Sequence, residues 1–286
     1  MNIVLLTALF AAAVAFILGI TLGFFKQLFH VPEDPIMAEI RDALPGANCG
    51  ACGYPGCENY AAAVAEGKAP LNACTVGGQA TAKKIAEITG GEAGEVVAKV
   101  AVLACQGSSV KAPVKGHYTG LKTCRGAKIA GGTKLCSWGC YGFGDCSKVC
   151  TFGAITMNEN NLPVVDYKKC TGCGVCAKEC PQKLFQLADR NQKGVILLCS
   201  NRNPVRSMVA KTCKIACYKC NQCIKNCREN CISMENYLPS VNLEKCVSCG
   251  VCTQICPSKV FKNVDKDETG VFCLTYKHSD GEKERI

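Results

Sequence analysis

The feature that most constrains this chain is a run of four closely spaced cysteines followed by a proline, which occurs twice. Residues 170–181 read CTGCGVCAKECP, and residues 246–257 read CVSCGVCTQICP. At this spacing three thiolates wrap one [4Fe-4S] cluster, and the fourth, directed by the proline turn, reaches a neighbouring cluster. Because both copies keep the full pattern, these cysteines are predicted to be cluster ligands rather than packed thiols.

Each run ends a longer internal repeat. Residues 136–150 (CSWGCYGFGDCSKVC) and 213–227 (CKIACYKCNQCIKNC) share four cysteine offsets, and the sequences that follow them also align. The period is about 77 residues, close to the length of a small two-cluster ferredoxin. We therefore expect two tandem ferredoxin-like units, at 136–200 and 211–275.

In the first unit, each half is expected to supply three ligands to its own cluster and one to the other. One cluster is predicted to bind Cys136, Cys140, Cys146 and Cys180. The other is predicted to bind Cys150, Cys170, Cys173 and Cys176. The wide spacing before Cys150 is interpreted as a loop insertion, in which Gly139, Gly142 and Gly144 allow the backbone to turn close to inorganic sulfide.

The second unit leaves two registers open. The repeat alignment selects Cys213 and leaves Cys220 spare, whereas the conventional spacing uses Cys220 instead. We favour the conventional spacing because it needs no loop insertion. One cluster is then predicted to bind Cys217, Cys220, Cys223 and Cys256, and its companion Cys227, Cys246, Cys249 and Cys252.

A fifth site precedes the duplication, in a small domain expected at 33–91. Its predicted ligands are Cys49, Cys52, Cys57 and Cys74. The first three lie in a glycine-rich loop, and the sequence ENYAAAVAEGK predicts a short helix that leads the chain back to Cys74. Four thiolates would also suit zinc, but the surrounding cluster motifs favour a fifth [4Fe-4S] cluster.

Six cysteines remain outside these sets. Cys105, Cys199 and Cys273 end or interrupt apolar runs, so they are predicted to be packed thiols on buried strands. Cys231 stands where the first unit has Ala154, and Cys124 receives no role. The segment 92–135, which holds two of the six, is expected to be an α/β connection. The sixth, Cys213, is kept as the alternative to Cys220.

The N-terminus predicts a membrane anchor. The stretch from Ile3 to Phe25 carries no charge and is long enough to cross a bilayer as one helix. Lys26 follows it directly, and no basic region precedes it, so residues 1–26 are interpreted as a retained anchor rather than a cleaved signal. The positive charges after the span place the bulk of the chain on the cytoplasmic side, where cysteines bind metal more often than they form disulfides. Residues 276–286 are expected to be a polar tail.

The charge of the chain does not indicate nucleic-acid binding. The formal net charge is +10, but each oxidised [4Fe-4S] cluster with four thiolates adds about −2, so five clusters bring the total near zero. The chain also lacks a dinucleotide-binding glycine motif after a strand, a phosphate-binding loop and a nucleophile with a base partner. It is therefore predicted to move electrons as a subunit, with no catalytic residues of its own.

These motifs together resemble a known family. The single N-terminal span, the sequence CGACGYPGC with Cys74, the segments VAVLAC and YTGLKTC, and GCYGFGDCSKVCTFGAI before CTGCGVCAKECP closely resemble the B subunit of the Rnf complex. The resemblance implies a membrane-bound, ion-translocating ferredoxin:NAD oxidoreductase, in which this subunit takes electrons from soluble reduced ferredoxin. It also implies other membrane and peripheral subunits as partners, which hold the flavins and carry out the NAD chemistry.

The predicted fold class is α+β, with one transmembrane helix, a small four-cysteine domain and two tandem ferredoxin-like units. The predicted function is a membrane-anchored relay of electrons through five [4Fe-4S] clusters. One alternative is an electron-transfer subunit or reductive activator of another anaerobic redox complex, against which the anchor argues. A zinc- or disulfide-stabilised interaction protein is a second alternative, and the paired CxxCxxCxxxCP runs oppose it.

Overall fold

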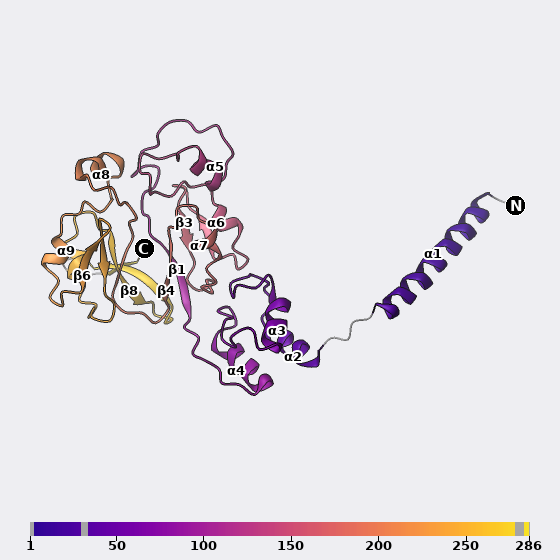
Figure 1. Ribbon diagram of the computed structural model, residues 1–286. Coiled ribbons are helices and arrows are strands. Elements are labelled where there is room, and N and C mark those ends of the chain that lie inside the picture. The colour runs from indigo at the N-terminus through magenta and orange to yellow at the C-terminus, as the bar shows by residue number, and fades with distance from the viewer. Residues whose placement is uncertain (1–2, 30–33, 278–282, 286) are drawn as a thin grey trace.

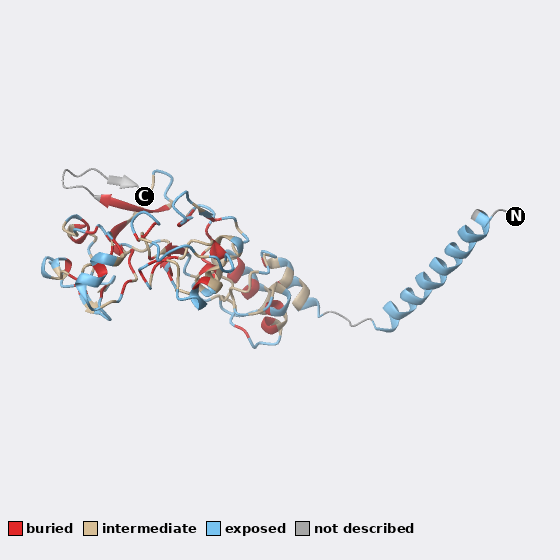
Figure 2. Cartoon of the chain, turned by 90° about the horizontal axis from the view of Figure 1, so that it is seen from above, coloured by how far each residue is buried: buried red, intermediate tan, exposed pale blue. Residues whose placement is uncertain are grey.

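The computed structural model describes residues 3–29, 34–277 and 283–285. Helix α1 (Ile3–Leu28) extends away from the folded body, as Figure 1 shows. Its segment Leu5–Leu28 has a mean hydropathy of 2.5 and is not buried against the rest of the chain (Figure 2). By length and composition it is the one candidate membrane span among the described residues, in agreement with the predicted anchor.

The four-cysteine domain is built from three short helices. They are α2 (Pro35–Ala43), α3 (Cys57–Ala65) and α4 (Gly78–Thr89). Asp34 begins α2 because its side chain accepts a hydrogen bond from the Ile36 N–H group. The apolar faces of the helices bury Ile40, Tyr60 and Ile85 in a common core. The helix predicted after the glycine-rich loop is confirmed as α3.

The first ferredoxin-like unit contains two pairs of antiparallel strands and three short helices. Strand β1 (Lys99–Leu103) pairs with β4 (Phe185–Asp189), with Leu103 opposite Phe185. Strands β2 (Ile155–Met157) and β3 (Pro163–Val165) form a hairpin. The helices are α5 (Cys124–Ile129), α6 (Asp145–Lys148) and α7 (Val175–Glu179). Because β1 completes this unit, the segment before residue 136 is part of the unit and more than a connection.

The second unit repeats this plan. Strand β5 (Val195–Leu197) pairs with β8 (Phe261–Lys266), with Leu197 opposite Phe261, as Leu103 is opposite Phe185 in the first unit. Strands β6 (Ile232–Glu235) and β7 (Leu238–Val241) form the hairpin. The helices are α8 (Arg206–Thr212), α9 (Gln222–Lys225) and α10 (Val251–Gln254). The repeated unit therefore begins at a strand, β1 or β5, upstream of the repeat visible in the cysteine spacing.

The two units interlock through the last strands of the chain. Strands β9 (Phe272–Lys277) and β10 (Lys283–Arg285) extend the β5–β8 pair into a four-stranded sheet. Phe272 of β9 is fully buried in the core of the first unit, where its ring centroid lies 4.9 Å from that of Tyr167. An ordered strand thus crosses the boundary expected at residue 276. Residues 278–282 and 286 of the predicted tail lie outside the described residues.

Candidate iron-sulfur sites

The cysteines gather in groups of four, and four of these groups line small cavities. Among the described His, Cys, Asp and Glu side chains, no three converge as the ligands of a single metal ion would. The thiols instead face one another in sets, which we name sulfur groups A to F.

Sulfur group A comprises the four cysteines predicted for the N-terminal domain, and the structure brings them together around one cavity. They are Cys49, Cys52, Cys57 and Cys74. Gly56 has a φ of 121°, a conformation open to glycine, and it turns the loop into α3. Asn48 fixes this turn by accepting a 2.8 Å hydrogen bond from the Cys57 N–H group. The Gly77 N–H group donates to the Cys74 sulfur at 3.4 Å.

Sulfur group B comprises Cys150, Cys170, Cys173 and Cys176, again a predicted set. Burial raises the pKa of Cys176 to about 12, and the nearby thiols of Cys170, Cys173 and Cys150 add to the shift. The N–H groups of Ala101 and Ala154 donate to the sulfurs of Cys170 and Cys150, at 3.4 and 3.3 Å. Such N–H donors stabilise thiolate charge.

Groups A and B are neighbours. After burial, which is the largest cause, Cys49 of group A is among the charges that raise the pKa of Cys173 in group B. The Lys178 ammonium donates a 3.4 Å hydrogen bond to the Gly50 carbonyl across the same contact. The N-terminal domain therefore presents its sulfur group to the first ferredoxin-like unit.

Sulfur group C differs from the predicted set. The cavity that holds Cys140, Cys146 and Cys180 is completed by Cys124, and Cys136 is absent from it. Helix α5 starts at Cys124, whose N–H group donates to the Asp145 carboxylate at 2.7 Å and fixes the thiol over the cavity. Burial raises the pKa of Cys146 to about 12, with Cys124 and Cys180 adding to the shift. No role was predicted for Cys124 because no ligand spacing includes it.

Sulfur group D lies between the two units and was not predicted. It comprises Cys105, Cys136, Cys199 and Cys213, which line one cavity. Burial raises the pKa of Cys136 to about 11, and the other three thiols add to the shift. Two of its members, Cys105 and Cys199, were expected to be packed thiols, and Cys136 was expected in group C. The wide spacing after Cys136 is explained because this cysteine belongs to a different group.

Each unit supplies an equivalent pair of thiols to group D. Cys105 stands two residues after β1 and Cys199 two residues after β5, and these strands hold the same place in their units. Cys136 and Cys213 are the first cysteines of the two repeats. Cys105 and Cys199 also accept hydrogen bonds from equivalent backbone N–H groups. The Cys140 N–H group donates to the Cys105 sulfur at 3.5 Å, and the Cys217 N–H group donates to the Cys199 sulfur at 3.3 Å. This symmetry was the available sequence signal.

The structure places Cys220 in sulfur group E. Its cavity is lined by the favoured set, Cys217, Cys220, Cys223 and Cys256. Cys213 is not spare, however, because it lies in group D. Both of the alternative cysteines, Cys213 and Cys220, therefore lie in a sulfur group.

Sulfur group F comprises Cys227, Cys246, Cys249 and Cys252, as predicted. Burial raises the pKa of Cys252 to about 12, and the other three thiols of the group are among the further causes. A fifth thiol is present, because the Cys231 sulfur lies 3.4 Å from that of Cys227. The first unit has Ala154 at this position.

The six groups form one continuous series. Besides burial, Cys146 of group C contributes to the raised pKa of Cys176 in group B. Cys105 of group D contributes in the same way to the raised pKa of Cys140 in group C. In the second unit, Cys199 of group D adds to the rise that burial causes in the pKa of Cys217 in group E. The series ends at group F, where Cys223 of group E adds to the rise that burial causes in the pKa of Cys252. Group D is thus the link between the two units.

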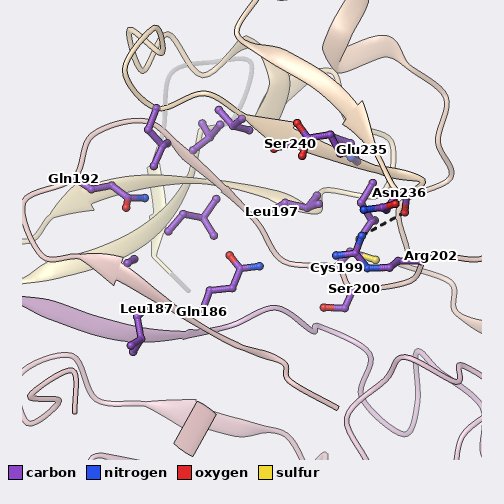
Figure 3. A pocket seen from close by; sticks show the side chains of 17 residues that line it. Gln186, Leu187, Gln192, Leu197, Cys199, Ser200, Arg202, Glu235, Asn236 and Ser240 are labelled. Atoms are coloured by element: carbon purple, nitrogen blue, oxygen red, sulfur yellow. Dashed lines mark hydrogen bonds between the residues drawn. The ribbon is translucent and has the colours of Figure 1, made fainter. Parts of the chain in front are cut away.

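A larger cavity in the body is separate from these spaces. It measures about 380 Å³ and lies between β4, β5 and the β6–β7 hairpin (Figure 3). Arg202 bridges its rim by donating a 3.4 Å hydrogen bond to the Asn236 carbonyl. Cys199 is the one thiol among its lining residues, so the cavity does not resemble the sulfur groups.

Three family models of iron-sulfur proteins match parts of the chain. Residues 44–76 match the family described as a putative Fe-S cluster, residues 138–185 the 4Fe-4S dicluster domain, and residues 239–262 the 4Fe-4S binding domain.

Curated relatives decide the family. The B subunit of the Na⁺-translocating ferredoxin:NAD⁺ oxidoreductase complex of Acetobacterium woodii is 42% identical over 84% of this chain and 72% of its own length. The B subunit of the ion-translocating oxidoreductase complex of Methanosarcina acetivorans is 34% identical over 88% of this chain and 95% of its own. Its counterpart in the proton-translocating ferredoxin:NAD⁺ oxidoreductase complex of Clostridium ljungdahlii is 35% identical over 92% and 94%.

The chain belongs to the family of Rnf complex B subunits. The resemblance seen in the sequence is confirmed, and the matches to the A. woodii, M. acetivorans and C. ljungdahlii Rnf B subunits each cover at least 84% of the chain. A second ferredoxin-like unit is therefore within the length that Rnf B subunits reach.

Proposed function

We propose that the protein is the iron-sulfur electron-transfer subunit of an ion-translocating ferredoxin:NAD oxidoreductase, and that it holds six [4Fe-4S] clusters. The observation that carries the proposal is the unbroken series of six four-thiol groups from the N-terminal domain through both units. Five groups were expected from the sequence. The sixth, group D, closes the gap that would otherwise separate the two units.

The residues fit clusters rather than zinc. The ligands of every group are thiols, and in groups A, C, D and E the sulfurs line a cavity. Among the described residues, no three potential ligands converge on one point. A zinc ion would draw four sulfurs to about 2.3 Å from a single centre, whereas a cuboidal cluster needs room between them. The raised pKa values of the buried thiols mean that they are protonated at neutral pH until a metal centre displaces the protons.

The chain contributes binding, insulation and local charge. When bound, each cluster takes up and releases one electron. Backbone N–H groups of Ala101, Ala154, Cys140 and Cys217 donate to ligand sulfurs and so favour the added negative charge. The buried thiols of groups C and D keep water away from the middle of the series, and the exposed Cys249 brings group F to the surface.

The anchor orients the series relative to the membrane. We assign α1 as a single span with the body on the cytoplasmic side, because Lys26 and Arg41 follow the span. The chain from Leu28 to Pro35 can extend about 25 Å at most, so group A stays near the membrane surface. Reduced ferredoxin would deliver electrons at the protein surface away from the anchor. The partner subunits would receive them near group A.

Metal analysis of the intact chain tests the proposal. Anaerobically purified full-length protein is expected to contain about 24 iron atoms and as many acid-labile sulfides per chain, with no zinc. About 20 of each would mean that one of the six groups holds no cluster and would return the count to five. Stoichiometric zinc with little sulfide would refute the electron-transfer function. In a second experiment, reduced ferredoxin is expected to reduce the protein.

A further inference from the structure

Two lysines are buried beside sulfur group D. The side chains of Lys134 and Lys219 are 3% and 6% exposed. The Lys134 ammonium donates a 2.6 Å hydrogen bond to the Gly107 carbonyl, and the Lys219 ammonium lies 3.4 Å from the Cys217 carbonyl. No carboxylate in the described part of the chain forms an ion pair with either one. Because a buried ammonium is costly without a compensating negative charge, this placement requires an explanation.

The lysines lie beside the sulfur atoms that would carry negative charge as thiolate ligands of a bound cluster. The Lys134 ammonium is held at the carbonyl of Gly107, which lines the cavity of group D. Burial raises the pKa values of Cys213 in group D and Cys140 in group C, and the charge of Lys134 partly offsets this rise. The Lys219 ammonium lies at the carbonyl of Cys217, whose own N–H group donates to the Cys199 sulfur of group D. Burial lowers the pKa of Lys219, and the sulfurs of Cys217, Cys199 and Cys136 partly offset this shift. The two lysines thus approach group D from different units, one from each repeat, and together they reach three of its four sulfurs.

We propose that Lys134 and Lys219 are the counter-charges of the link between the two units, and that they raise the reduction potential of the cluster held by group D. This inference rests on the proposed function. An oxidised cluster with four thiolates carries about −2, and reduction by one electron makes it about −3. A fixed positive charge nearby stabilises the reduced form more than the oxidised form, and burial strengthens the effect.

The position of group D gives this tuning a function. The group lies between groups C and E, so the potential of its cluster controls how readily an electron crosses from one unit to the other. Without the two ammonium groups, the extra electron would enter a site that already carries the negative charge of its own four thiolates. The lysines offset that repulsion.

The repeat provides a matched control for the test. Lys211 occupies the position of Lys134 in the second repeat, two residues before Cys213, but its side chain is exposed. The Lys134→Met, Lys219→Met and Lys211→Met variants of the full chain are compared by iron content and by redox titration followed by electron paramagnetic resonance. The signal of group D is identified as the one that Cys199→Ala removes.

We expect Lys134→Met and Lys219→Met each to retain iron and to lower the reduced-to-oxidised ratio of group D at least tenfold at a fixed potential, which corresponds to about 59 mV for one electron. Lys211→Met should change the ratio less than threefold. Full iron with an unchanged ratio in both buried variants would overturn the inference.

Two further outcomes separate the inference from the proposed function. If Cys199→Ala removes neither iron nor a signal, group D holds no cluster, and the six-cluster proposal itself fails. If Lys219→Met loses iron, Lys219→Arg is measured instead. Restored iron with the wild-type ratio supports the counter-charge role, whereas restored iron with a lowered ratio contradicts it.

Discussion

Removal of one thiol from group D distinguishes the linking site from a packed cysteine. Cys199 and Cys273 are both buried, at 8% and 4% exposure, and both lie in or beside strands of the same sheet. In each case, substitution by alanine deletes one buried sulfur, which costs about 1 kcal/mol of folding free energy in transfer terms alone. If both were packed thiols, as the sequence suggested, the two variants should behave alike.

The structure predicts that they differ. Cys199 lines the cavity of group D with three other thiols, so Cys199→Ala should lower the iron content from about 24 to about 20 atoms per chain, with an equal loss of sulfide. Cys273 lies in β9 and lines none of the cavities of groups A, C, D and E, so Cys273→Ala should keep all of the iron. Cys199→Ala should also slow electron transfer between the units, because the link is absent.

Paired iron and sulfide determinations on anaerobically purified, full-length variants check this prediction, with circular dichroism to show that both are folded. The reasoning is refuted if Cys199→Ala keeps the wild-type iron content, or if Cys273→Ala loses the same four atoms. Equal losses in both variants would mean that the iron content reports general instability and not ligation.

Particular contacts elsewhere in the body lead to three more predictions. Because Cys231 lies 3.4 Å from Cys227, Cys227→Ser should retain the group F cluster through Cys231, whereas Cys150→Ser in the first unit should lose four iron atoms. Iron analysis of the Cys227→Ser, Cys231→Ser double variant, which should lose them too, checks the substitution. Burial raises the pKa values of Cys140 and Cys146 in group C to about 12, so these thiols ionise at lower pH in the unfolded chain than in the folded protein. Cluster-free protein should therefore lose stability above about pH 9, measured by thermal unfolding. Phe272→Ala should cost about 3–5 kcal/mol in urea unfolding, because Phe272 is fully buried in the core of the first unit. A cost below about 1 kcal/mol would contradict the interlocking of the units.

Local spacing was sufficient for sites whose ligands are close in sequence. Groups A, B, E and F are the predicted sets, because a short loop between cysteines leaves few ways to arrange three thiols around one space. The helix after the glycine-rich loop and the candidate span were also predicted, since each depends on a continuous pattern of residues.

Cysteine spacing was not sufficient to predict the members of groups C and D. Cys124 joins group C because the N-terminus of α5 is fixed to Asp145, a contact with no spacing rule. Group D draws its thiols from the ends of β1 and β5 and from the starts of both repeats, so it exists only when the two units pack against each other.

The sequence alone determined that this chain binds iron-sulfur clusters, that it is duplicated and that it carries a candidate membrane span, because these properties reside in spacing and hydrophobicity along the chain. The tertiary structure decided which cysteines share a site across the units, and where the buried Lys134 and Lys219 stand relative to them. The reason is that distance in space between residues of different units is set by packing, as with Phe272 in the core of the first unit, and no local pattern encodes it.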